Sequence, residues 1–326
     1  MNSQSDVSQL HPDLISHPCY SRVFQPGKLT FGFIMPLEGY AHSPFPTMAD
    51  HGRMAKLADE AGFAALWMRD VPFYDPNFGD TGQMFDPFVY LGYLAGQTRQ
   101  IALGTAGIVL PLRDPLIVAK QAVSVDQLSG GRLILGLSSG DRAVEYPAFG
   151  IDYQSRAERY QEGVQLINTV TQNSFPSADT THFGTLTGAI DLIPKPVGRR
   201  IPTLVVGCAR QDFSWIAEHT DGWMWHLSDF RRLPQLIADW RASWPDATFR
   251  PYSYGSFYDI TEDPDAPLQQ VGNGVRLGRN ALIALWKRQQ AEGVSHIAVN
   301  LKPIRRPAED VLAELAEHVL PHFRID

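Results

Sequence analysis

Short apolar runs alternate with amphipathic segments along nearly the whole chain, and corners rich in Gly, Pro or polar residues separate them. Runs of this kind predict buried parallel strands, and the amphipathic segments predict the helices of repeated βα units. The apolar runs lie at residues 29–36, 63–68, 101–111, 132–140, 201–207, 221–226, 252–260 and 296–301. Eight such units predict an α/β fold, a single-domain (β/α)8 TIM barrel with loop insertions over residues 29–326, after an N-terminal extension of residues 1–28.

The predicted helices have readable ends. Thr47 is the expected cap of the first helix, Pro87 suits the first turn of the second, and a Gly stop ends the third. These helices and a longer fourth one span residues 47–62, 86–98, 115–131 and 156–171. The next segment, up to residue 200, is expected to be irregular or hairpin-like, and residues 261–278 show no clear period.

No GxGxxG follows the first predicted strand, so a closed barrel is favoured over an open dinucleotide-binding sheet. A barrel places its active site at the carboxyl ends of its strands. The polar or small residues there are therefore the candidates for chemistry.

Two strand ends suggest ligand contacts. Ser138, Ser139 and Gly140 leave the fourth strand as a binding edge, or as a capped turn in which Asp141 and Arg142 pair at the surface. After the fifth strand, backbone N–H groups from Cys208 to Asp212 and the charge of Arg210 suit a phosphate. The alternative there is an ordinary strand-to-helix corner with Asp212 as the helix cap.

Two further strand ends carry titratable groups. Arg69 and Asp70 follow the second strand, either as substrate-binding and proton-handling groups or as a structural ion pair that orders the loop. His226 ends the sixth strand, where its proton serves catalysis or it is a satisfied structural residue. The other histidines examined, His296 among them, are interpreted as surface or loop positions.

Composition narrows the function classes. The net charge of −7 and the lack of a basic stripe argue against nucleic-acid binding. Cys19 and Cys208 are expected to be free thiols, and no signal-peptide-like start or 18-residue apolar run occurs, which predicts a cytoplasmic protein outside the membrane. No HExxH and no GxSxG occur, so neither a metal site nor a hydrolase nucleophile is expected.

Several segments occur in a recognisable order: LTFGFIMP, EAGFAALWMRD, a run from Ile101 to Gly140 that contains RDP, DQLSGGR and an LGL strand, and IPTLVVG. In this order the chain resembles the luciferase-like flavin monooxygenase and deazaflavin-dependent oxidoreductase superfamily, over roughly residues 29–320. RDVPFYDPNFGD, DPFVYLGYLAGQT and SGDRAVEYPAFG resemble one bacterial subgroup of luciferase-type oxidoreductases without an assigned substrate.

The resemblance implies an FMN-type cofactor across the barrel mouth, with its ring against the third and fourth strand ends and its phosphate near the fifth. Thr105 and Ala106 match the family position of a non-prolyl cis peptide beneath the ring. The expected cofactor-binding residues are Met35, Thr105, Ala106, Ser138, Ser139, Gly140, Gly207, Cys208, Ala209, Arg210 and Gln211. Light-emitting members carry a catalytic His after the second strand, where this chain has Arg69, Asp70 and Val71, so luminescence is not expected.

The expected activity is that of a two-component monooxygenase, in which reduced FMN from a separate flavin reductase reacts with O2 and one oxygen atom enters a small organic substrate. Arg69, Asp70 and His226 are the candidate catalytic residues. One alternative is hydride transfer with the deazaflavin coenzyme F420, and another is a non-catalytic flavin-binding protein. The resemblance also implies a homodimer that buries the early barrel helices.

Overall fold

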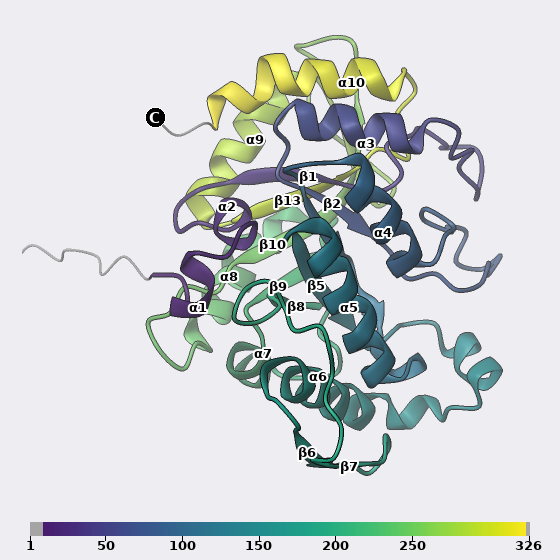
Figure 1. Ribbon diagram of the computed structural model, residues 1–326. Coiled ribbons are helices and arrows are strands. Elements are labelled where there is room, and N and C mark those ends of the chain that lie inside the picture. The colour runs from purple at the N-terminus through teal and green to yellow at the C-terminus, as the bar shows by residue number, and fades with distance from the viewer. Residues whose placement is uncertain (1–8, 324–326) are drawn as a thin grey trace, which may run out of the picture.

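The computed structural model describes residues 9–323, and its centre is a closed barrel of parallel strands (Figure 1). The ring runs β10–β13–β1–β2–β3–β5–β8–β9, and it closes because β10 also pairs with β9. These strands are β1 Thr30–Ile34, β2 Ala65–Met68, β3 Ala102–Thr105, β5 Leu133–Ser138, β8 Thr203–Val206, β9 Gly222–His226, β10 Tyr252–Ile260 and β13 His296–Asn300. The prediction of an eight-stranded (β/α)8 barrel is confirmed.

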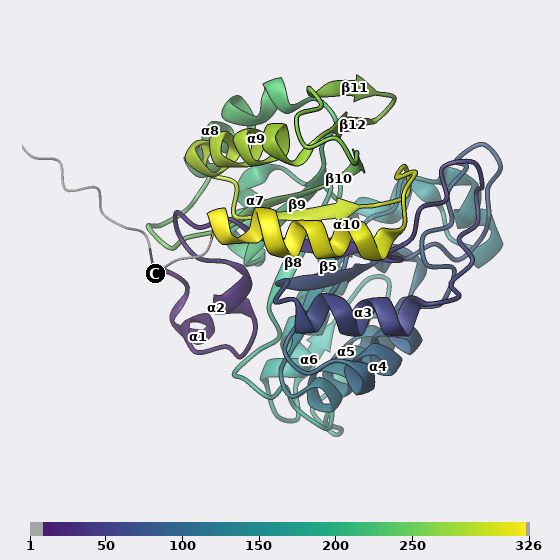
Figure 2. The same cartoon turned by 90° about the horizontal axis from the view of Figure 1, so that it is seen from above.

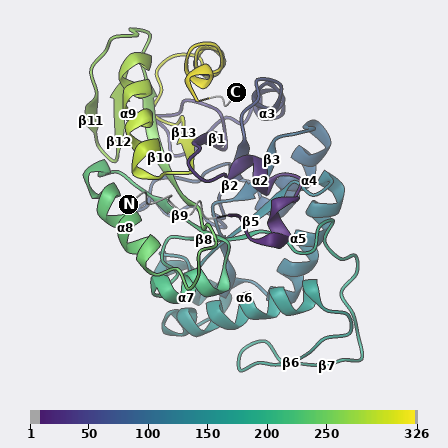
Figure 3. The ribbon, with the colours of Figure 1, turned by 90° about the vertical axis from the view of Figure 1, so that its left-hand side faces the viewer.

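Helices surround the barrel, as the view in Figure 3 shows. They are α3 His51–Glu60, α4 Pro87–Gln97, α5 Pro115–Ser129, α6 Arg156–Gln172, α7 Phe213–His219, α8 Leu233–Ala242, α9 Arg279–Glu292 and α10 Ala308–Glu314. Three of the predicted end signals are confirmed. Pro87 opens α4, Gly130 in the left-handed conformation (φ 71°) ends α5, and the Asp212 carboxylate caps α7 through Trp215 N at 2.8 Å.

Alternate residues of each strand face two different cores. One face of the strands packs against the helices in the large outer core. The other face fills the barrel interior, where glycines make room for bulk: a Cβ on Gly104 would meet Trp67 Cε3 at 2.3 Å. Trp67 is fully buried there, so the lower barrel is a packed core rather than a pore.

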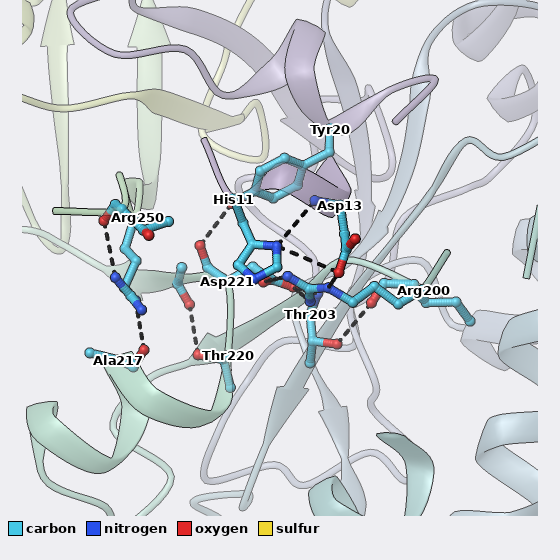
Figure 4. Close-up of polar contacts among 12 residues, drawn as sticks. His11, Asp13, Tyr20, Arg200, Thr203, Ala217, Thr220, Asp221 and Arg250 are labelled. Atoms are coloured by element: carbon cyan, nitrogen blue, oxygen red, sulfur yellow. Dashed lines mark hydrogen bonds and ion pairs between the residues drawn. The ribbon is translucent and has the colours of Figure 1, made fainter. Parts of the chain in front are cut away.

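The N-terminal extension seals the amino-terminal end of the barrel with two short helices, α1 Pro12–Ile15 and α2 Tyr20–Val23 (Figures 1 and 2). Tyr20 and Phe24 are buried in the same core as the inward residues of the strands. The Tyr20 hydroxyl donates to the backbone oxygen of Asp221 at 2.7 Å, and the Asp221 carboxylate in turn binds Arg200 (Figure 4). The extension is thus joined to the sixth strand of the ring.

His296 also lies at this end, fully buried, so its interpretation as a surface or loop residue was wrong. Trp67 Nε1 donates to His296 Nε2 at 2.9 Å, and His296 Nδ1 lies 2.7 Å from Thr30 Oγ1. The Thr30 hydroxyl donates to the backbone oxygen of Val23 at 2.7 Å. Burial lowers the pKa of His296 from 6.5 to about 3, so the ring is neutral and both of its nitrogens have partners.

The structure differs from the sequence-based expectations in three places. The first barrel helix begins at His51, not at Thr47, because the chain turns at Met48 (φ 59°), where Glu38 binds the backbone N–H groups of residues 47 and 48. The third predicted strand is interrupted after Thr105 and resumes as β4 Ile108–Val109, which pairs with β5. The segment 261–278 contains a hairpin, β11 Gln269–Val271 and β12 Gly274–Leu277.

The excursion after α6 is hairpin-like, as expected, with β6 Ser177–Asp179 paired to β7 Thr185–Thr187. Figure 1 places this hairpin away from the barrel mouth. The hairpin β11–β12 instead extends the sheet beyond β10, since β12 pairs with residues 257–260. Only the second hairpin is therefore close to the strand ends where a site is expected.

Candidate active site at the barrel mouth

A cavity of about 980 Å³ lies at the carboxyl ends of the strands. Ile34, Val206, Met224 and Gly255 contribute from the strands themselves. Most of the predicted site residues line it: Arg69, Asp70, Ala106, Ser138, Ser139, Gly140, Gly207, Cys208, Ala209, Arg210 and His226. Its size suits a cofactor together with a small substrate.

Three of the expected cofactor-binding residues do not line the cavity. Met35 is 1% exposed and packs in the outer core. Thr105 is fully buried, and its hydroxyl exchanges two hydrogen bonds with the backbone of Gly136. The Gln211 side chain faces α6, where it bonds Gln161 and the backbone oxygen of residue 157, so it braces the corner after β8 from outside.

The non-prolyl cis peptide bond lies between Ala106 and Gly107, one residue later than expected. The hydrogen bonds to Gly136 keep Thr105 within β3, and the cis peptide bond follows the end of this strand. Gly107 lines the cavity, and a Cβ there would meet Val206 Cγ2 at 2.8 Å. The floor beside β3 is therefore bare backbone, which a flat ring can approach closely.

The binding edge after β5 is held tightly from behind. Ser138 Oγ donates to the backbone oxygens of residues 107 and 108 at 3.3 and 3.2 Å, and the Tyr146 hydroxyl donates to Ser139 O. Gly140 has φ +69°, and a Cβ on it would meet Val109 Cγ1 at 2.6 Å. Only glycine fits here, which keeps backbone exposed at the cavity wall.

The corner after β8 has the properties of an anion site. Ala209 and Arg210 both adopt left-handed conformations (φ 47° and 63°), and the N–H groups of residues 208–210 have no hydrogen-bond partner within residues 9–323. Arg210 is exposed toward the cavity. Burial raises the pKa of the Cys208 thiol, so it adds no negative charge to oppose an anion.

Arg156, which the sequence analysis missed, brings a second cation to the cavity. It opens α6, is 5% exposed, and stacks over the Tyr153 ring with Cζ 3.5 Å from the centroid. Neither Arg156 nor Arg210 forms an ion pair with any carboxylate in the described part of the chain. Buried Arg156 and exposed Arg210, both without a counter-ion among the described residues, give this side of the cavity a positive charge that suits an anion.

Asp70 is part of a structural ion pair, the second of the two roles that the sequence left open. Its side chain is 2% exposed, and its two oxygens accept from Arg113 Nε and Nη2 at 2.9 and 2.7 Å. Val109 N also donates to Asp70 Oδ2 at 2.9 Å. The partner is Arg113 rather than Arg69, and the pair fixes β4 against the end of β2.

Arg69 instead pairs with Asp80, from the loop that follows β2. Gln83 binds both backbone groups of Arg69, so the loop returns to the strand end that it left. Lys302 Nζ lies 3.6 Å from Asp80 Oδ1, and the Tyr40 hydroxyl donates to the same oxygen at 3.3 Å. Burial alone would raise the pKa of Asp80, but the Arg69 and Lys302 charges outweigh it and hold this pKa below its usual value.

His226 lines the cavity, where its side chain is partly exposed to solvent and partly enclosed by the surrounding protein. This burial lowers its pKa, and the charge of Arg69 lowers it further. The ring centroid lies 5.6 Å from that of Phe257. His226 is thus a neutral imidazole at neutral pH, placed at the mouth between an apolar ring and a guanidinium.

Arg142 pairs with Glu145 at 3.2 Å and not with Asp141, so the alternative of a surface pair between Asp141 and Arg142 is wrong. The pair is internal, with both side chains less than 10% exposed. Arg142 also stacks on the Phe78 ring at 3.9 Å and donates to Phe73 O at 3.3 Å. It therefore ties the loop after β2 to the segment after β5, over one side of the cavity.

Sequence reasoning missed Arg156, Asp80, Glu145 and Lys302 because they lie on loops or at a helix start, with no strand end to mark them. Arg156 had one usable signal: it begins the helix that follows the strand ending at Ser138, Ser139 and Gly140.

No helix in residues 9–323 is long and apolar enough to cross a bilayer.

Comparison with known proteins identifies relatives in sequence. Residues 29–308 match the family model described as luciferase-like monooxygenase. A sequence relative, 4-hydroxyprotoasukamycin monooxygenase of Streptomyces nodosus subsp. asukaensis, is 28% identical over 155 residues, which cover 47% of this chain and 40% of the relative. Matches to the first three curated relatives span between 40% and 56% of the relative's own length.

Solved structures with the same fold include enzymes with two kinds of cofactor. An F420-dependent secondary alcohol dehydrogenase, solved with an F420-acetone adduct, has a TM-score of 0.74 at 17% identity and covers 91% of this chain and 100% of its own. The oxygenating constituent of 3,6-diketocamphane monooxygenase from Pseudomonas putida, solved with FMN, has a TM-score of 0.70 at 13% identity and covers 92% of this chain and 100% of its own.

Proposed function

This chain belongs to the luciferase-like monooxygenase family, and from that premise we propose that it is a two-component, reduced-FMN-dependent monooxygenase that acts on a small organic substrate. The observation that carries the proposal is the corner formed by Gly207–Arg210 and Arg156, which holds two cations without counter-ions among the described residues. The rest of the cavity leaves room for a flavin ring and a substrate. Such a corner suits the phosphate of FMN, which is doubly charged at neutral pH.

The other cofactor contacts follow from the cavity wall. The backbone at Ala106, Gly107 and Gly140 gives a flat ring close access, while Ser138 and Ser139 hold the edge of β5 in place. Reduced FMN, when bound, supplies the electrons and the site at which O2 is activated. The expected contacts with Met35, Thr105 and Gln211 are indirect, since these side chains stabilise the wall from behind.

The chain's own residues position the substrate and handle charge. Neutral His226 offers one ring nitrogen as a proton acceptor within the mouth. Arg69, held by Asp80, supplies a fixed positive charge that orients an anionic group of the substrate. The Arg142 bridge between two loops excludes water from one side of the cavity. Asp70 serves structure, because both of its oxygens are engaged.

The test is anaerobic titration of the purified protein with reduced FMN and, separately, with F420, followed by fluorescence. We expect reduced FMN to bind and F420 to bind at least about tenfold more weakly, since the two cations of the corner match a phosphate monoester dianion, whereas the phosphate of F420 is a singly charged diester. Tight binding of F420 alone would replace oxygen chemistry with hydride transfer. Reduced FMN that binds but releases only hydrogen peroxide across a substrate panel would indicate a non-catalytic flavin-binding protein.

We further propose that the protein forms a homodimer through α4 and α5, with its flavin delivered by a separate reductase. Val89 and Tyr93 on α4 and Ile117 on α5 are 72%, 44% and 58% exposed. A groove of about 340 Å³ beside α5, lined by Leu112, Ile117 and Phe149 among others, offers space for a partner side chain. Apolar side chains exposed in this number on neighbouring helices favour burial against a second copy.

A further inference from the structure

The corner formed by residues 207–210 and Arg156, which we call the phosphate corner, lies on one side of the cavity. The cavity wall on either side of β1 lies apart from it. Arg69 follows β2, Asn300 ends β13 and Lys302 comes two residues later, so the three flank β1 on its two neighbouring strands. In the ring order, β8 is four strands from β1 in both directions. Arg69, Asn300 and Lys302, which we call the donor wall, therefore face the phosphate corner from across the mouth.

The donor wall carries one positive charge that the described residues do not neutralise. Arg69 and Lys302 share a single carboxylate, that of Asp80. Asp80 Oδ1 also accepts from Gly82 N at 3.1 Å, so both oxygens are engaged. The nearby Glu38 carboxylate binds two backbone N–H groups at 2.7 and 3.0 Å and does not line the cavity. Asp141 lines the cavity on the far side, after β5.

Arg69 and Asn300 present hydrogen-bond donors without acceptors, whereas Lys302 Nζ also donates to the backbone oxygen of Gly79 at 3.2 Å and lies 4.9 Å from the centroid of the Tyr40 ring. Of the five N–H donors of a guanidinium, Arg69 uses Nη1 for Asp80, and its side chain forms no other hydrogen bond within residues 9–323. Asn300 Oδ1 accepts from Lys302 N at 3.0 Å, which leaves the Nδ2 donors of Asn300 for the cavity. The Arg69 and Lys302 side chains are each 17% exposed, and mostly enclosed donors with a surplus charge call for an oxyanion.

The space beside these donors is apolar. Phe257 and Trp225 line it from β10 and β9, and Ile34 and Met224 form the floor. A ligand that satisfies both parts has an apolar body and one anionic oxygen group. A single surplus charge matches a carboxylate rather than a phosphate, and the fork of Arg69 suits its two oxygens.

We propose that the donor wall binds the carboxylate of a substrate whose remaining body is aromatic or aliphatic, so that the enzyme acts on small organic monocarboxylates. The assignment of this ligand as substrate rests on the proposed function. The phosphate corner holds one end of the cofactor, and the donor wall holds the charged end of the molecule opposite. The reacting carbon lies in the apolar space between them.

Calorimetric titration with benzoate and its neutral isostere benzamide tests the proposal, on the protein alone and with reduced FMN under anaerobic conditions. We expect benzoate to bind at least about tenfold more tightly than benzamide. Lys302→Met keeps the length of the stem and removes the charge, and it should reduce this preference to about twofold or less. Lys287→Met, on an exposed lysine of α9, is the matched control and should keep the preference.

Equal binding of the two probes by the wild-type protein, or no binding of either, would overturn the proposal. So would a Lys302→Met protein that loses affinity for reduced FMN but keeps its preference for benzoate, because the wall would then serve the flavin ring. Asn300→Ala provides a second variant if Lys302→Met unfolds. If benzoate selectivity depends on Lys302 while neither reduced FMN nor F420 binds, the carboxylate site stands and the proposed function fails.

Discussion

The role of a single side chain in this barrel depends on whether another group of the protein already binds it. Asp70 looked like a proton-handling group, yet Arg113 and Val109 N use both of its oxygens. Arg156 drew no attention, yet its guanidinium has no carboxylate partner among the described residues and lines the cavity. Position at a strand end did not distinguish these cases, because the ion pairs depend on the conformation of loops. Hydrophobic periodicity in the sequence does not predict that conformation.

Arg156→Gln should weaken the binding of FMN at least about tenfold and leave riboflavin, which lacks the phosphate, nearly unchanged. The reason is that the substitution removes a charge from the phosphate corner while keeping polar bulk beside Tyr153. Fluorescence titration of both flavins measures the difference. Arg288→Gln, at an exposed arginine of α9, is the control. Equal losses for FMN and riboflavin would assign Arg156 to structure instead.

His296 makes stability depend on pH. Its folded-state pKa of about 3 lies below the ordinary 6.5, so the unfolded chain binds a proton that the folded chain does not. The free energy of unfolding should therefore fall as pH drops below about 6.5, by about 1.4 kcal/mol per pH unit from this residue. In urea unfolding at pH 7, 6 and 5, His296→Gln should show the shallower dependence. A dependence as steep as that of the exposed-site control His42→Gln would contradict the assignment.

At the scale of elements, the barrel strands were predictable because burial on both faces leaves long apolar runs in the sequence. The hairpin β11–β12 was not, since residues 269–271 are exposed and carry no apolar period. The start of α3 was also missed, because Glu38, more than ten residues away in the chain from His51, organises the turn before it. Local signals therefore located elements with a buried face and failed where distant contacts set the boundary.

The seal formed by α1 and α2 should contribute substantially to stability. Phe24 is fully buried in the inner core, and its ring lies 5.0 Å from that of Tyr20. Phe24→Ala should lower the free energy of unfolding by about 3–5 kcal/mol, since it opens a cavity that the rigid strand ends cannot fill. Ile15→Ala, at a 51% exposed position of the same extension, should change it by less than about 0.5 kcal/mol. Chemical denaturation of both variants measures this, and equal effects would show that the extension is not part of the core.

For the whole molecule, the two ends of the closed barrel have different roles. The amino-terminal end is filled by Trp67, His296 and the N-terminal extension, whereas the carboxyl end stays open as the cavity. That division follows from the (β/α)8 fold and was predictable once eight strands were recognised. The charge pattern within the mouth was not, because it depends on loops after β2, β5 and β13 meeting across the ring.

The dimer proposal is tested at this scale. Val89→Glu places a charge on the exposed face of α4 and should shift the protein from dimer to monomer, because burying an unpaired carboxylate in an interface costs several kcal/mol. Light scattering after size-exclusion chromatography gives the mass. Leu268→Glu, at an exposed apolar residue elsewhere, should leave the dimer intact. A wild-type protein that is monomeric at micromolar concentration would contradict the proposal.

The bond from Tyr20 to Asp221 also has a consequence for synthesis on the ribosome. The two residues are 201 positions apart, so the first helices emerge long before the strand that receives them. At roughly 5–20 residues per second, the extension waits about 10–40 s with Tyr20 and Phe24 uncovered. Closing the amino-terminal end of the barrel is thus a late event in translation, and the segment made early is among the last to become protected from chaperones and proteases.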